Sequence, residues 1–215
     1  MNKKSLTSKL INAPYLLWSV LFILAPMVMV VYYAFTDRSG NFTWDNITAL
    51  TAYKETFGRS IWYAVLATAI CLLLSYPLAY IMSRSGVSKQ RTLMMLIMLP
   101  MWMNFLIRTY SWITILANTG ILNSIFKAIG IGQVQMINTP GAVILGMVYN
   151  FLPYMVLPIY SVMSKLDYSL VEAAQDLGCN NRAVLRKVIF PMSVPGVISG
   201  ITMVFVPSVS TFYIS

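Results

Sequence analysis

The chain has 215 residues, of which 58% are hydrophobic and only 10% are charged, and its mean hydropathy is +0.72. A soluble domain of this size cannot bury so much apolar surface, so the composition excludes a soluble globular protein and indicates one that sits in a lipid bilayer. The net charge of +9 does not indicate nucleic acid, because the Lys and Arg residues separate apolar runs instead of forming one basic patch.

Histidine is absent, and cysteine occurs only twice, at Cys71 and Cys179. Histidine is the commonest general base and metal ligand available to a protein, and two isolated cysteines do not form a disulfide framework. We therefore predict no catalytic residues, no metal site and no nucleic-acid partner.

Five apolar segments are long enough to cross the ~30 Å hydrocarbon core of a bilayer, which takes about 20 helical residues. The predicted spans cover residues 14–35, 61–82, 93–116, 140–163 and 191–214. They are preceded by an N-terminal tail, residues 1–13, and the last two are separated by a polar loop, residues 164–190. This pattern predicts an all-α polytopic membrane protein.

The distribution of basic residues predicts the orientation of the spans. The N-terminal tail and the loops after the second and fourth spans carry ten Lys and Arg residues, whereas the alternating loops carry four. Because basic loops stay in the cytoplasm, we place the N-terminus and the 164–190 loop on that side. The first segment is too long for a signal peptide and is followed by no small-residue cleavage site, so we expect a retained anchor.

The sequence ends at Ser215, directly after the fifth apolar segment and without a polar tail. Five spans that begin in the cytoplasm end outside it. We expect that a sixth span is missing, and we favour a truncated chain over a natural five-span protein.

The 164–190 loop contains the pattern of a short helix. Ser169 followed by Glu172 matches a capping box, in which Ser169 caps the helix and Glu172 reaches back. Gly178 suits a left-handed C-terminal cap. A stripe of small apolar residues between them consists of Ala173, Ala174 and Leu177. An alanine-faced helix that ends at glycine is typical of a docking surface for a soluble partner.

A second helical turn is predicted after Gly178, with Asn180 or Asn181 as its cap. Arg182, Arg186 and Lys187 follow on one helical side. The positive-inside rule alone accounts for these three charges, so they add little evidence for a partner.

The loop resembles that of a known family, the binding-protein-dependent permeases of ABC importers. Their EAA signature is matched here by Glu172-Ala173-Ala174, Gly178, Val188, Phe190 and Pro191. The resemblance implies a type I ABC importer permease (MetI-like) helical bundle in the bacterial cytoplasmic membrane. It also implies a coupling function for Glu172, Ala173, Ala174, Leu177, Gly178, Val188 and Pro191.

The same resemblance implies the partners: a second permease subunit, a cytoplasmic ABC ATPase dimer and an extracytoplasmic substrate-binding protein. The chain has no Gly-x-x-x-x-Gly-Lys-Ser/Thr loop to hold ATP phosphates. We therefore expect no cofactor on this chain, no enzyme activity of its own, and ATP consumption by the partner ATPase.

Segments outside the loop are similar to the spermidine/putrescine permease subgroup, in particular to its first permease subunit. They are Leu99-Pro100, residues 107–112, residues 120–123 and residues 205–212. The resemblance implies a polyamine substrate, which carries several positive charges. A cation gains roughly 0.5–2 kcal/mol over an aromatic face, and no Asp or Glu lies inside a predicted span. The candidates for the substrate path are Trp102, Asn104, Tyr110, Asn150 and Tyr154.

These path residues have an ordinary alternative explanation, because Trp and Tyr are common at membrane interfaces. Arg108 is the one charge inside a predicted span. A cation is a poor ligand for a cationic substrate, so we favour a structural or gate-latching role for Arg108. Gly196 and Gly200 match a helix close-packing motif, for which packing within the chain is favoured over a subunit contact.

Two classes of function remain open. The first is the transmembrane permease subunit of an ATP-driven importer, with polyamines as substrate or, alternatively, another small solute. The second is a non-transport membrane protein, either an embedded enzyme or an inactive truncated fragment. The absence of histidine and of intramembrane carboxylates argues against the enzyme.

Overall fold

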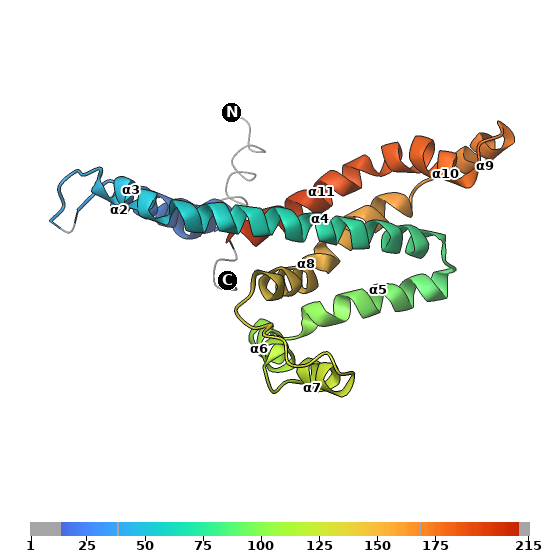
Figure 1. Cartoon of the computed structure of the whole chain (residues 1–215). Coiled ribbons are helices and arrows are strands. Elements are labelled where there is room, and N and C mark those ends of the chain that lie inside the picture. Colours follow the sequence, from blue (N-terminus) through green and yellow to red (C-terminus); the bar gives the residue numbers. More distant parts are fainter. Residues whose placement is uncertain (1–13, 38, 168, 211–215) are drawn as a thin grey trace, which may run out of the picture. The chain divides into compact units, whose positions relative to one another are not determined.

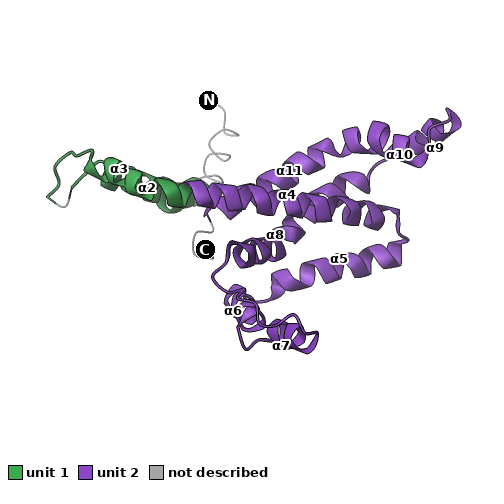
Figure 2. Cartoon of the chain, viewed as in Figure 1, with its two compact units in different colours: residues 1–57 green, residues 58–215 purple. Residues whose placement is uncertain are grey.

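A computed structural model describes residues 14–37, 39–167 and 169–210, and these residues are almost entirely helical (Figure 1). The predicted N-terminal tail and residues 211–214 of the predicted fifth span lie outside the described residues. The chain divides into two compact units, residues 1–57 and residues 58–215 (Figure 2).

The first unit contains the apolar helix Pro14–Ala34, whose side chains are almost all exposed. Its middle is the π-turn η1 (Val20–Leu24), and its second half is α2 (Ala25–Ala34). The short helices α3 (Asp45–Ala49) and η2 (Leu50–Tyr53) follow.

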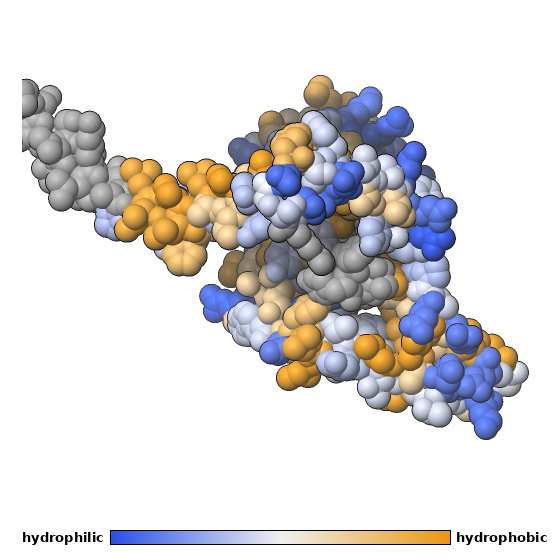
Figure 3. Space-filling model, turned by 90° about the vertical axis from the view of Figure 1, so that its left-hand side faces the viewer, coloured by the Kyte–Doolittle hydropathy of each residue, from blue (hydrophilic) through white to orange (hydrophobic). Residues whose placement is uncertain are grey.

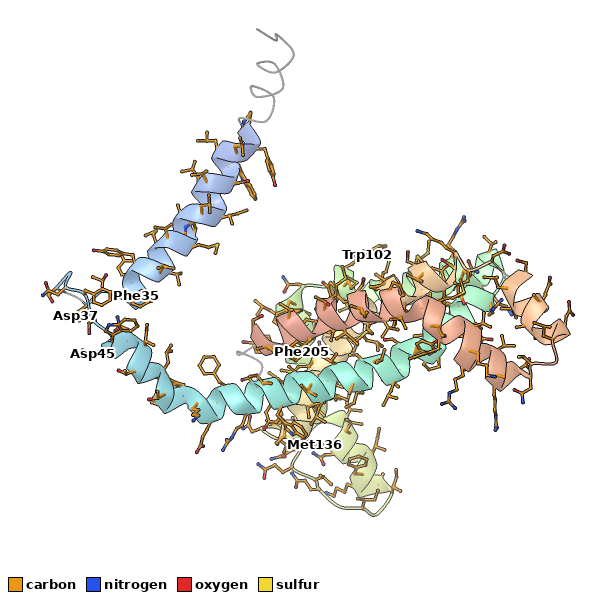
Figure 4. All side chains as sticks on the ribbon, turned by 90° about the horizontal axis from the view of Figure 1, so that it is seen from above. Phe35, Asp37, Asp45, Trp102, Met136 and Phe205 are labelled. Carbon is orange, nitrogen blue, oxygen red and sulfur yellow. The ribbon has the colours of Figure 1, made fainter. Side chains whose placement is uncertain are left out.

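A compact turn joins α2 to α3, with Phe35, Asp37 and Asp45 around it (Figure 4). The side-chain amide of Asn46 donates to the carbonyls of Tyr33 and Thr36, at 3.0 and 3.1 Å. It thereby satisfies backbone groups that the end of α2 leaves without helical partners.

The second unit holds the remaining helices. Their bounds are α4 (Lys54–Arg84, beginning just before the unit boundary), α5 (Val87–Trp102), α6 (Phe105–Leu116), α7 (Ile121–Ala128), α8 (Pro140–Met163), α9 (Ser169–Asp176), α10 (Asn181–Val184), η3 (Leu185–Ile189) and α11 (Phe190–Ser210). Within the described residues, four helices are long and apolar enough to cross a membrane, or five if the bent pair α5 and α6–α7 counts as one span.

The segment predicted as a single span over residues 93–116 is broken. The helices on either side of the break are bent by 93°. Met103 and Asn104 have extended ψ angles of 145° and 132°, and Asn104 Oδ1 accepts the N–H of Leu106 at 2.8 Å to begin α6. Asparagine favours such caps because its side chain competes for backbone N–H groups. Hydrophobicity alone did not reveal this stop.

The segment predicted as a span from residue 191 belongs to a longer helical stretch, Asn181–Ser210. Pro191 therefore lies inside it. The π-turn η3 ends just before this proline, and the N–H of Phe190 donates to the carbonyl of Leu185, five residues earlier. A proline ring clashes with the carbonyl four residues back, and the wider turn moves that carbonyl away. The π-turn η1 precedes Pro26 in the same way.

The core of the second unit lies where α4, α8 and α11 pack together. The closest approach is between α8 and α11, because a Cβ on Gly196 would lie 2.9 Å from the Pro158 carbonyl oxygen and one on Gly200 2.7 Å from Met155 Sδ. The close-packing motif therefore serves packing within the chain, as favoured from the sequence.

Many large apolar side chains are exposed on both units. In the space-filling view they lie on the outer surface beside polar residues (Figure 3). A soluble monomer rarely exposes contiguous apolar surface of this extent, so the helices are suited to contact with lipid.

Candidate functional site

The loop between α8 and α11 starts at a side-chain cap on Asp167. The Ser169 backbone N–H donates to Asp167 Oδ1 at 3.0 Å, and the Leu170 N–H donates to the Asp167 carbonyl. Hydrogen bonds from Ser169 lower the pKa of the Asp167 carboxyl below its ordinary value, and the bond from the backbone N–H contributes more than the bond from the hydroxyl. Ser169 is inside the helix, so its predicted role as the cap is wrong; Asp167 caps α9 from two residues upstream.

Helix α9 presents two different faces. Val171 is buried, and Ala174 packs against the core. Leu170, Ala173 and Leu177 are exposed, with Leu177 at 86%. Ala173 and Ala174 therefore do not share one stripe, because neighbouring positions are about 100° apart on a helix. The spacing i, i+3, i+7 places Leu170 in the same exposed row, although Leu170 lies outside the EAA signature.

Gly178 ends α9 in the predicted left-handed conformation, with φ of 81°. Its N–H donates to the Gln175 carbonyl at 2.8 Å, and the Cys179 N–H donates to the Ala174 carbonyl at 3.0 Å. These two bonds make a Schellman motif. A Cβ at Gly178 would meet nothing within 4 Å, so the backbone angle is the reason for glycine within this chain.

The second half of the loop begins at Asn180, whose side chain accepts the Ala183 N–H at 2.8 Å. Of the two predicted caps, Asn180 is the one used. Val188 packs against the core, and Glu172 and Pro191 are exposed. The basic side chains at positions 182, 186 and 187 are exposed. The turn therefore carries an acidic and apolar helix on one side and a basic helical segment on the other.

The five predicted path residues are not assembled into one cluster. Asn104 is used as the cap of α6, and Trp102 projects from the end of α5 with 76% of its surface exposed (Figure 4). Tyr110 and Tyr154 are also exposed. No hydrogen bond or ring contact joins any two of the five, all of which are described.

Asn150 differs from the other candidates because it is only 6% exposed, within α8. Its Oδ1 has no hydrogen-bond partner among the residues that the structure describes. A buried amide oxygen without a partner costs free energy, so Asn150 has unused capacity to accept a hydrogen bond.

Arg108 spans the break between α5 and α6. Its Nη1 donates to the Pro100 carbonyl at 2.6 Å, and its guanidinium lies 5.8 Å from the Phe105 ring centre and 5.9 Å from that of Tyr149. Trp112 also meets Tyr149, edge to face at 5.2 Å. The side chain thus ties together the end of α5, the start of α6 and the middle of α8.

The segment after α6 is organised by a polar residue for which the sequence predicted no structural role. Asn123 is buried in α7; its amide donates to the carbonyls of Ala117 and Val134, and its Oδ1 accepts the Val134 N–H. The bonds to both sides of α7 close the loop between α6 and α8.

Residues 75–214 match the family of binding-protein-dependent transport system inner membrane components. The chain is 39% identical over 208 residues to the spermidine/putrescine transport system permease protein PotB of Haemophilus influenzae, covering 92% of this chain and 73% of the relative. It is 36% identical to PotB of Escherichia coli, covering 92% of this chain and 76% of the relative.

Solved structures support the same fold. A bacterial ABC transporter involved in the import of the acidic polysaccharide alginate matches with a TM-score of 0.73 and 18% identity, over 91% of this chain and 70% of that one. The alginate transporter in complex with its pentasaccharide-bound periplasmic protein matches with a TM-score of 0.71 and 17% identity, over 91% and 69%. The fold is therefore that of an ABC importer permease.

Proposed function

Because this chain belongs to the family of binding-protein-dependent transport system inner membrane components, we propose that it is a permease subunit of an ATP-driven polyamine importer. The observation that carries the proposal is the 36–39% identity with spermidine/putrescine permeases across 92% of the chain. Its substrates are spermidine, putrescine or both.

The drive for transport enters through the 164–190 loop. Exposed Leu170, Ala173 and Leu177 form an apolar row beside the exposed carboxylate of Glu172. A short helix with an apolar anchor row and a charged edge fits a groove on a soluble partner. The coupling residues are those predicted from the EAA signature, and Leu170 joins them.

The partners are a second permease, two cytoplasmic ABC ATPase subunits and an extracytoplasmic binding protein. The ATPase subunits bind and hydrolyse ATP, and this chain holds no cofactor. In this arrangement the loop faces the cytoplasm of a bacterial cell, and the N-terminus lies on the same side.

Within the path, Asn150 is the best of the five candidates. Its buried amide oxygen without a partner is suited to accept a hydrogen bond from a substrate ammonium. Trp102, Asn104, Tyr110 and Tyr154 remain secondary candidates. Arg108 holds the α5–α6 break and serves as a structural or gate-latching residue.

The coupling part is tested at Gly178 in the assembled complex. Gly178→Asp places a carboxylate on the docking surface, where desolvation of an unpaired charge is costly. We expect uptake per ATP hydrolysed to fall by about tenfold or more. Gly178→Asn is the matched control, because asparagine has the same shape as aspartate without its charge and tolerates the left-handed backbone. Unchanged uptake and ATP hydrolysis in Gly178→Asp would refute coupling through this loop.

The substrate part is tested by reconstituting the full complex with its binding protein in liposomes. Spermidine and putrescine are expected to stimulate ATP hydrolysis and to be taken up. Unrelated amino acids are expected neither to stimulate ATP hydrolysis nor to be taken up. Stimulation by another small solute, with none by either polyamine, would favour the alternative of a permease for that solute.

A further inference from the structure

The helix that leaves the coupling loop, α11, is hydrogen-bonded to α4 through a buried serine and a half-buried tyrosine. The Ser193 hydroxyl is fully buried and lies 3.1 Å from the Tyr76 hydroxyl. Ser193 Oγ also donates to the Phe190 carbonyl at 2.9 Å. A serine hydroxyl has one proton, so Tyr76 is the donor in the bond between the two helices.

The position of this bond connects the loop to a deformable part of α4. Tyr76 directly precedes Pro77, and Ser193 lies between Pro191 and Pro195. Each proline removes a helical hydrogen bond, so both helices bend more easily there. The Tyr76 ring also meets the Phe190 ring, with centres 5.8 Å apart.

A second tyrosine makes a similar bond from α8, the helix that precedes the coupling loop. Tyr160 in α8 donates to Gln90 Oε1 at 3.1 Å, and Gln90 Nε2 donates to the Ser85 carbonyl at 2.8 Å. Ser85 lies in the turn between α4 and α5, and Gln90 lies in the first turn of α5. A tyrosine hydroxyl therefore joins each helix that flanks the coupling loop to an earlier helix: α11 to α4, and α8 to α5.

We infer that Tyr76 and Tyr160 are positioning residues that carry displacement of the coupling loop from α11 and α8 into α4 and α5. The inference rests on the proposed function, since the loop must be moved by an ATPase. Without these bonds, α8 and α11 still pack through Gly196 and Gly200, but their motion is transmitted less completely to the neighbouring helices.

The test measures uptake and ATP hydrolysis by the assembled complex in liposomes. Tyr76→Phe keeps the ring and removes the donor. A net hydrogen bond of this kind corresponds to roughly a twofold to tenfold change in an equilibrium, so uptake per ATP is expected to fall by that factor. Ser193→Ala should give the same loss, and the double variant no more than either single one.

Tyr80→Phe is the matched control, because it removes a hydroxyl from the next turn of α4 and is expected to leave uptake per ATP unchanged. Tyr160→Phe is expected to resemble Tyr76→Phe. Equal falls in uptake and ATP hydrolysis, with their ratio unchanged, would show that the hydroxyls only stabilise the fold and would overturn the inference. Additive losses in the double variant would do the same.

A second readout does not depend on the transported solute. Spin labels at exposed Leu74 and Met192, with Cys71 and Cys179 replaced by alanine, report the distance between α4 and α11. In the protein with Tyr76, the distribution of distances between the two labels should stay narrow when ATP is added. Tyr76→Phe should broaden that distribution. An identical distribution in both proteins overturns the inference, whereas failure of polyamine uptake by the wild-type complex refutes the proposed substrate instead.

Discussion

At the residue scale, the fold of the 164–190 loop depends on a few side chains that bond to the backbone. Asp167 and Asn180 accept the N–H groups that begin the helical turns, and Gly178 provides the left-handed residue between them. Cap and turn preferences of this kind are local, since the side chain bonds to its own neighbours in sequence. Their local nature explains why the sequence predicts Gly178 as a turn residue and narrows the second cap to Asn180 or Asn181. The Asp167 cap was not predicted, because Ser169 and Glu172 match a capping box.

The Asp167 cap gives a pH-dependent prediction. Because its hydrogen bonds lower the carboxyl pKa, the cap is complete above the ordinary value of 3.8 and is lost as pH falls through the lowered pKa. A carboxyl NMR titration should have its midpoint below 3.8, and Ser169→Ala should raise that midpoint.

Loss of the cap should loosen the first turn of α9. Asp167→Ala is expected to speed hydrogen exchange of the Ser169 and Leu170 amides, whereas Asp167→Asn, an equally good cap, is expected to protect them. Equal exchange in both variants would show that the carboxylate does not cap the helix.

At the scale of elements, α8 and α11 form the tightest pair because glycines bring their backbones together. A Cβ at Gly196 would meet the Pro158 carbonyl and the Ile159 Cα, at 2.9 and 3.1 Å, neither of which is a flexible side-chain end. The contact is decided by two helices far apart in sequence, which explains why the glycine spacing alone did not reveal its partner.

The glycine contact predicts opposite effects at two helical positions. Gly196→Ala is expected to destabilise the folded chain by about 1–3 kcal/mol, as overpacking does. Gly58→Ala in α4, where a Cβ meets nothing within 4 Å, should stabilise it by about 0.5–1 kcal/mol. Thermal unfolding of both variants in the same detergent measures the difference, and equal melting temperatures would contradict the close contact.

At the scale of the whole molecule, the orientation in the membrane still rests on the count of basic residues. Cys179 lies in the loop proposed to face the cytoplasm, and Cys71 is buried in the core. The loop between α6 and α8 is separated from that loop by one span, so the same orientation places it outside, and Lys127 is exposed within it.

A membrane-impermeant maleimide tests this orientation in cells that assemble the transporter. Lys127→Cys is expected to be labelled in intact cells, because its loop is proposed to lie outside. Cys179 is expected to react only after the membrane is permeabilised, and a Cys179→Ser background identifies its signal. Labelling of Cys179 in intact cells would show that the orientation is the reverse of the one proposed.

The amino-acid sequence alone predicted the helical membrane architecture, the polar loop at residues 164–190 and the glycine turn within it. Those features depend on hydrophobic length and on local turn chemistry, both of which are readable over a few residues. The folded chain was needed to reveal the bend beside Asn104, the burial of Asn150 and the bond between Tyr76 and Ser193. The bend follows from an asparagine cap that hydrophobic length does not reveal. The burial and the bond depend on which segments meet in space, and apolar helices of similar composition carry little information about their neighbours.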